Sequence, residues 1–171
     1  MDQMDKSSLL VLHNYNDYAN QLVLDTASRM TEAELIKESS PSHGNVKTLL
    51  LHIVLCEYGF ILRCLGTPPE SVTDDFDNYS FEEIRELYAR VAGMRKDYLE
   101  IVNENELNEI IPTVIGKHQL ALPRWQMLAQ SLVHSTHHRG ELSIVLTALG
   151  YPLPTLDILL EFIKESGQQW S

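Results

Sequence analysis

The sequence has little that would suit an oxidising compartment or a polyanionic partner. Only two of its 171 residues are cysteines, Cys56 and Cys64. Both fall in one expected helix more than two turns apart, so a disulfide between them is geometrically unfavourable. Lysine and arginine number 13 against 24 aspartates and glutamates, which gives a formal net charge of -11. Because no basic patch offsets this charge, we expect no nucleic-acid partner and no binding to an anionic membrane.

Long apolar runs and a basic leader are also missing. No segment approaches the roughly 18 consecutive apolar residues of a membrane span. Residues 1–8 lack the basic stretch and apolar core of a secretory signal, and we therefore expect a cytoplasmic protein. No repeat, low-complexity stretch or composition shift marks an internal boundary. Residues 1–171 are predicted to form a single domain, since a chain of this length can bury one sizeable core.

Helical periodicity is the dominant pattern that the chain does have. Apolar residues recur every three or four positions in four long stretches, at residues 7–30, 42–65, 80–105 and 123–149. Helices of these lengths would each run about 33–40 Å, and binding sites form between the facing sides of such helices when they pack together. The sequence therefore predicts an all-α fold built as a four-helix bundle.

Shorter elements are expected between and after the long helices. Residues 31–34 and 80–83 both have the pattern of a capping box, so a helical turn should begin at each. β-Branched residues surround the Gly-Lys pair at 116–117, which is typical of a small hairpin before the fourth long helix. A short C-terminal helix is expected at residues 155–165.

Three histidines fall on helix faces that should point into this bundle. His134 and His138 are four residues apart, so their side chains project about 40° from each other on the apolar arc that carries Leu142. His52 shares an apolar stripe with Leu49 on the second long helix. Three neutral imidazoles would suit Zn²⁺, Ni²⁺ or another first-row divalent ion and would leave positions for water or substrate. The alternative is that each is a core histidine that hydrogen-bonds a carbonyl or carboxylate.

Three other side chains carry weaker signals. Glu141, three residues after His138, could orient an imidazole or act as a base, although a glutamate at such a position is more often a helix-surface charge. Asp157 could reach a pocket mouth or cap the terminal helix. Cys56, one turn after His52, could be a fourth ligand, but a small buried hydrophobe is the commoner role. The catalytic residues therefore stay unassigned, with Glu141 and Asp157 as weak candidates.

Further histidines and an arginine are expected outside this site. On the same projection, His137 and Arg139 fall on the outer side of the fourth long helix. His43 precedes the second long helix and would help to cap it. Neither histidine is assigned to metal.

Four segments of the chain together resemble the DinB-like family. They are SHGNVKTLLLHI at residues 42–53, HSTHHRGE at 134–141, the ending LGYP at 149–152 with Leu156-Asp157, and YNDYAN at 15–20. The resemblance implies an up-down-down-up bundle that binds one divalent metal through three histidines, usually as a homodimer. Carried onto this sequence, those ligands are His52, His134 and His138. The family often has a tryptophan where this chain has Tyr18, which would alter the pocket lining.

The resemblance also narrows the classes of activity. Known reactions of DinB-like proteins include thiol-dependent transfer and isomerisation, with bacillithiol or mycothiol as cosubstrate. The resemblance thus implies a metal-dependent transferase, in which the metal activates a low-molecular-weight thiol and this thiol attacks a small-molecule substrate. Two alternatives remain: a metal-dependent hydrolase, and a nonenzymatic bundle that binds a ligand or partner and holds a structural metal.

Overall fold

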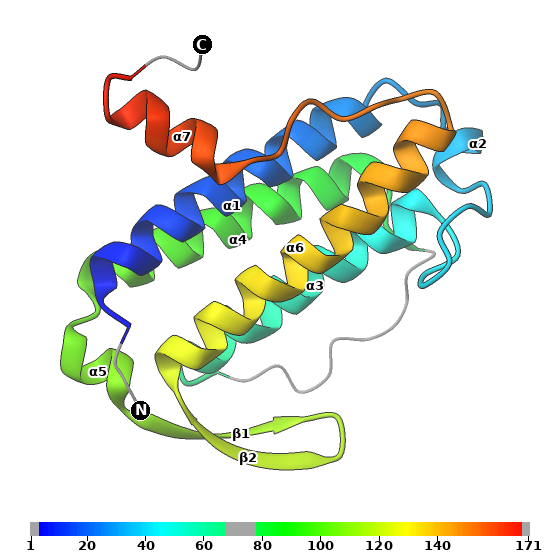
Figure 1. Cartoon of the computed structure of the whole chain (residues 1–171). Helices are drawn as coiled ribbons and strands as arrows, with labels where there is room; N and C mark the ends of the chain where they lie inside the picture. Colours follow the sequence, from blue (N-terminus) through cyan, green and yellow to red (C-terminus); the bar gives the residue numbers. More distant parts are fainter. Residues whose placement is uncertain (1–3, 68–77, 169–171) are drawn as a thin grey trace.

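The computed structural model describes residues 4–67 and 78–168 (Figure 1). These residues form seven helices and one two-stranded antiparallel sheet, so the fold is mostly helical, as predicted. The helices are α1 (Lys6–Ala27), α2 (Glu32–Leu35), α3 (Val46–Cys64), α4 (Phe81–Ile101), α5 (Glu104–Asn108), α6 (Arg124–Ala148) and α7 (Ile158–Glu165). The strands are β1 (Ile110–Ile115) and β2 (His118–Pro123).

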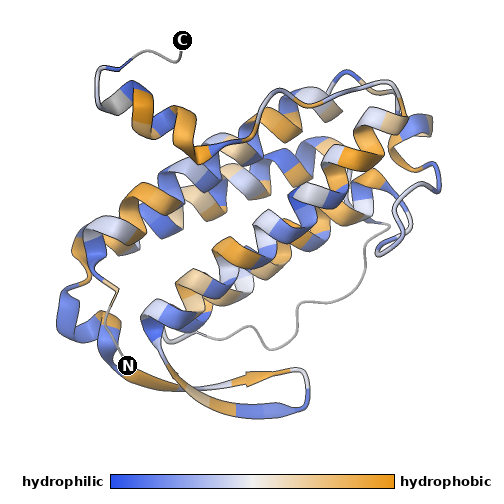
Figure 2. Cartoon of the chain, in the orientation of Figure 1, coloured by the Kyte–Doolittle hydropathy of each residue, from blue (hydrophilic) through white to orange (hydrophobic). Residues whose placement is uncertain are grey.

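The four long helices pack side by side around one core. α3 contacts both α4 and α6, and α1 contacts the same two helices, so the four form a closed ring (Figure 1). Each long helix has apolar and polar segments along its length (Figure 2). Leucine and isoleucine side chains from all four are fully buried, including Leu9, Leu49, Ile84 and Leu142. α3 is the most apolar of the four and lies against α6, and this pair carries the three histidines predicted as metal ligands.

Most helix starts follow the sequence signals. Both predicted capping boxes are confirmed, with reciprocal hydrogen bonds at residues 31–34 and 80–83. The expected third helix is wrong at its end, because residues 80–105 divide into α4 and α5. Val102 adopts an extended backbone with ψ 140°, and Asn103 then caps α5 with a further capping box to Glu106. A strong cap at Asn103, two residues before the expected end, thus starts a new helix.

The predicted hairpin precedes α6 as expected. Ile115 pairs with His118, and Gly116 in the turn between them has φ 58°, a left-handed conformation that glycine adopts without a steric penalty. Within the described residues, no helix is long and apolar enough to cross a membrane.

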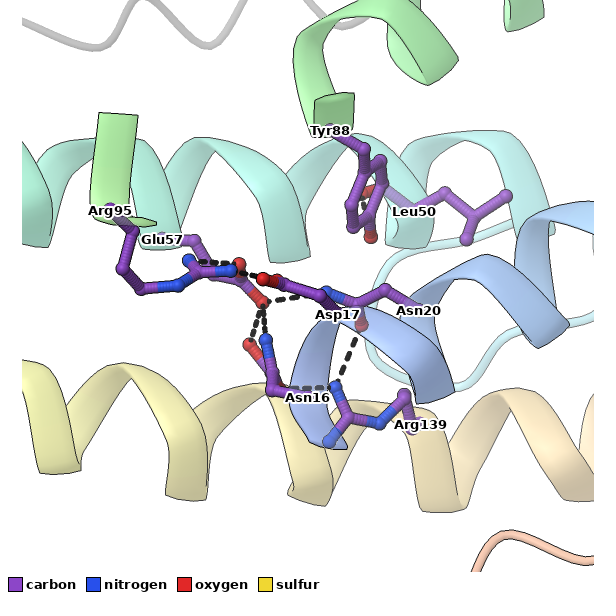
Figure 3. Close-up of polar contacts among 9 residues, drawn as sticks. Asn16, Asp17, Asn20, Leu50, Glu57, Tyr88, Arg95 and Arg139 are labelled. Atoms are coloured by element: carbon purple, nitrogen blue, oxygen red, sulfur yellow. Dashed lines mark hydrogen bonds and ion pairs between the residues drawn. The ribbon is translucent and has the colours of Figure 1, made fainter. Parts of the chain in front are cut away.

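A buried carboxylate lies at the centre of the bundle (Figure 3). Glu57 of α3 is 2% exposed and accepts hydrogen bonds from Arg95 on α4 at 2.8 Å, Asn16 and Asn20 on α1 at 2.9 and 3.0 Å, and Ser135 on α6 at 2.6 Å. Burial alone would raise the pKa of Glu57, but the Arg95 guanidinium and the neutral donors lower it to about 2. One ionised side chain therefore joins all four long helices.

Arg139 extends this network and corrects an expectation. The side chain is 5% exposed rather than on the outer side of α6, and it donates to the Oδ1 atoms of Asn16 and Asn20 at 2.6 and 2.7 Å (Figure 3). Because α6 packs against both α3 and α1, its buried surface is wider than its apolar arc. The polar part of that surface faces the amides of α1.

Candidate metal centre

The histidines of α3 and α6 meet in a compact cluster. The ring centroid of His52 lies 5.0 Å from that of His134 and 4.8 Å from that of His138, and the two rings on α6 are 4.6 Å apart. The Nε2 atoms of His52 and His134 are separated by 3.1 Å. Helix packing thus brings together the three side chains that the sequence analysis named as ligands.

The nitrogen spacing suits a shared cation. With metal–nitrogen bonds of about 2.0–2.1 Å, neighbouring ligand nitrogens around a tetrahedral or octahedral ion lie about 2.9–3.4 Å apart. The His52–His134 separation of 3.1 Å falls within this range. The Nδ1 atoms of His134 and His138 are buried and have no hydrogen-bond partner among the described residues. His138 therefore has a buried nitrogen that is free to bind an ion, whereas the atom of His134 that faces His52 is Nε2 and not its unpaired Nδ1.

The protonation of the cluster also suits metal binding. Burial, followed by the neighbouring histidines, lowers the pKa values of His52 and His134 to about 4. Burial lowers the pKa of His138 as well. The imidazoles are therefore neutral at neutral pH, which is the form that binds a metal.

Cys56 offers a sulfur donor at this site in addition to the imidazoles. Its Sγ lies 3.8 Å from Nε2 of His52, and ligand atoms of His52, Cys56 and His134 all lie within 4.8 Å of one another. These three residues could hold a metal ion. Burial raises the pKa of Cys56 to about 11, so without a cation the side chain is a neutral thiol. Two alternatives for the third donor therefore exist, Cys56 and His138.

His43 is a fourth imidazole that the sequence analysis missed. Its ring centroid lies 3.9 Å from that of His52 and 5.1 Å from that of His138. The expected capping role is wrong, because Asn45 caps α3 by accepting a hydrogen bond from the backbone of Thr48. At this distance the His43 ring lies in contact with the His52 ring, tilted by 32° to it, so His43 covers the cluster from the loop that precedes α3.

Glu141 fixes this loop to α6. Its carboxylate accepts hydrogen bonds from the hydroxyls of Ser40 and Ser42, each at 2.5 Å, and from the Ser42 amide at 3.1 Å. The Ser42 hydroxyl also lies 2.7 Å from Nδ1 of His43. Burial would raise the pKa of Glu141, but the serine hydrogen bonds outweigh it and lower the pKa to about 2. Glu141 is thus neither a free surface charge nor a poised base, and its Oε2 lies 3.8 Å from Nδ1 of His138.

Replacing Glu141 with glutamine should loosen this loop. The amide keeps one acceptor oxygen but loses the charge that strengthens its hydrogen bonds, so we expect the free energy of unfolding to fall by about 1–2 kcal/mol. Urea denaturation measures the loss, and limited proteolysis should show faster cleavage near Ser42. Glu86→Gln on the exposed side of α4 is the control and should change little. Equal stability and equal cleavage in the two variants would contradict the assigned role of Glu141.

Asp157 lies away from the histidine cluster. It caps α7, accepting a hydrogen bond from the Leu159 amide at 2.9 Å, which is one of its two expected roles. It also lines a cavity of about 480 Å³ bounded by α1, α6 and the segment that leads into α7. None of His52, His134 and His138 lines that cavity.

The architecture and the site together define a mostly helical protein with a histidine cluster between two adjacent long helices. The family model of the DinB family matches residues 3–169, so the chain belongs to the DinB family. No curated protein matches the chain.

Proposed function

We propose that this protein is a metal-dependent enzyme that transfers a low-molecular-weight thiol to a small electrophilic substrate. The observation that carries the proposal is the meeting of the rings of His52, His134 and His138, with the Nε2 atoms of His52 and His134 at a ligand-like 3.1 Å. Family membership supports the same ligand set. Zn²⁺, Ni²⁺ and other first-row divalent ions all accept neutral imidazole ligands, so the proposal covers this group of metals.

The chemistry follows from the charge of the site. Neutral ligands leave a divalent ion its full positive charge, and such an ion lowers the pKa of a bound thiol so that thiolate is available near neutral pH. His52, His134 and His138 would hold the ion from one side of the cluster. His43, which lies against the His52 ring and is held through Ser42, would limit which molecules approach from the loop side.

The proposal includes the up-down-down-up topology and a cytoplasmic homodimer. In Figure 1, α1 and α6 run in one direction and α3 and α4 in the other, which supports that topology. Both cysteines are free, as expected in a reducing compartment. The dimer rests on the family resemblance, and light scattering of the purified protein tests it.

A metal-removal experiment tests the activity. The purified protein is analysed for bound metals, treated with chelator, reloaded with single divalent ions, and assayed with bacillithiol, mycothiol or cysteine and an electrophile such as monochlorobimane. We expect thiol conjugation that chelator abolishes and one or two ions restore. Metal-dependent hydrolysis of ester or amide substrates without thiol would favour the hydrolase. Protein that binds metal but catalyses neither reaction would favour the nonenzymatic bundle.

A further inference from the structure

A cavity separate from the histidine cluster lies between α1 and α6. Its volume of about 480 Å³ is within the range of small-molecule sites, about 300–1,000 Å³. Apolar side chains from both helices and from the segment before α7 form most of its wall, among them Leu12, Leu132, Leu156 and Ile158. Its polar residues on α6, Thr136 and Arg139, project about 140–160° away from His134. The cavity and the cluster thus lie on different sides of one helix.

Arg139 is the buried polar group of this cavity. Hydrogen bonds to Asn16, Asn20 and the Thr136 hydroxyl hold the guanidinium in place and use three of its five N–H donors. Among the described residues, no carboxylate forms an ion pair with Arg139. Arg95, by contrast, pairs with carboxylates on two other helices. The cavity therefore contains an immobilised cation with donors to spare.

We propose that this cavity binds a small molecule with an apolar body and a single carboxylate head, and that Arg139 receives the head. A guanidinium fork matches the geometry of a carboxylate, and a fixed fork loses little entropy when it binds. The mouth of the cavity carries a negative charge, because Asp157 is exposed there. A second anionic group at the outer end of the ligand would be repelled. The apolar wall and the charge of Asp157 together favour a monocarboxylate with an uncharged tail.

Calorimetric titration of the full chain with octanoate and, separately, with 1-octanol tests this assignment. We expect saturable one-to-one binding of octanoate and about tenfold weaker binding of the alcohol, since a hydrogen bond to a charged group is typically worth a factor of this size. Ala129 lines the cavity from α6. Ala129→Phe should fill the space and weaken octanoate binding by at least about tenfold. Ala148→Phe, an exposed site on the same helix outside the cavity, is the matched control and should bind octanoate as the wild type does.

Circular dichroism and melting curves establish that both phenylalanine variants fold. Arg139→Lys keeps the positive charge but removes the fork, and it should reduce the preference for octanoate over octanol. Equal affinity for the two probes would overturn the role of Arg139. Octanoate binding that survives Ala129→Phe would overturn the cavity assignment. A dimer in light scattering that Ala129→Phe converts to monomer would also overturn it, by showing that a second copy of the chain fills the groove.

Discussion

Replacing Arg95 with methionine should lower the free energy of unfolding by about 3–5 kcal/mol at neutral pH. The substitution keeps most of the side-chain volume but removes the one cation that contacts Glu57 among the residues the structure describes, and this carboxylate is 2% exposed. An ion left unpaired in the interior keeps its desolvation cost and loses the attraction that offset it. Urea or guanidinium denaturation, followed by circular dichroism, measures the effect.

A control on the same helix isolates this buried pair. Lys96 is exposed and follows Arg95 directly, so Lys96→Met should change stability by less than about 0.5 kcal/mol. The double variant Arg95→Met/Glu57→Met removes both charges and should recover part of the loss, because replacing a whole buried ion pair with apolar residues is often nearly neutral. If Arg95→Met were as mild as the control, the network would not support the fold as described.

The Glu57–Arg95 pair also makes the free energy of unfolding depend on pH. In the wild type, the pKa of Glu57 is lowered from 4.5 to about 2, so the carboxylate stabilises the fold fully above pH 4.5 and loses that contribution as the pH falls toward 2. Without Arg95, burial should raise the folded-state pKa of Glu57 above its ordinary value. The variant then takes up a proton more readily when folded, and its deficit relative to wild type should shrink in acid. Denaturation midpoints at pH 7 and pH 4 test this difference.

The sequence predicted the elements of the fold better than the polar contacts between them. Hydrophobic spacing and capping boxes depend on neighbours along the chain, and they located the long helices, the hairpin and two helix starts. Glu57 and Arg95 form their pair across two helices, so no local pattern marks either one. Projection placed Arg139 on the outside because it ranks positions by apolar neighbours, whereas the amides of Asn16 and Asn20 make that position favourable for a buried guanidinium.

In the candidate site, too, the sequence predicted the residues on helix faces but not the residue on a loop. His52, His134 and His138 lie on helix faces whose direction follows from the helical repeat, so the sequence could bring them together once a bundle was assumed. His43 lies on the loop before α3. Its position depends on hydrogen bonds that Ser40 and Ser42 of this loop donate to Glu141 on α6. Such contacts between distant segments become visible only in three dimensions.

Replacing His134 with alanine should abolish stoichiometric metal binding. Its Nε2 faces that of His52 at 3.1 Å, and both proposed ligand sets include it. Changes to residues that merely orient ligands typically weaken metal binding about 10–100-fold, so loss of a direct ligand should exceed about 100-fold. Competition with a chromophoric chelator measures the affinity, and elemental analysis gives the stoichiometry. His118→Ala is the matched control, because this exposed histidine on β2 lies outside the cluster and should leave affinity unchanged.

Two further variants identify the third ligand. If His138 completes the site, His138→Ala should weaken binding as strongly as His134→Ala, and Cys56→Ala should have a small effect. If Cys56 is the ligand, the order reverses, and the Co²⁺-loaded protein should show the intense near-ultraviolet absorption of a thiolate–metal bond. Burial raises the pKa of the Cys56 thiol, so this second case requires the bound ion to displace the thiol proton. Wild-type affinity in His134→Ala would contradict both ligand sets, because each of them includes the His134 imidazole.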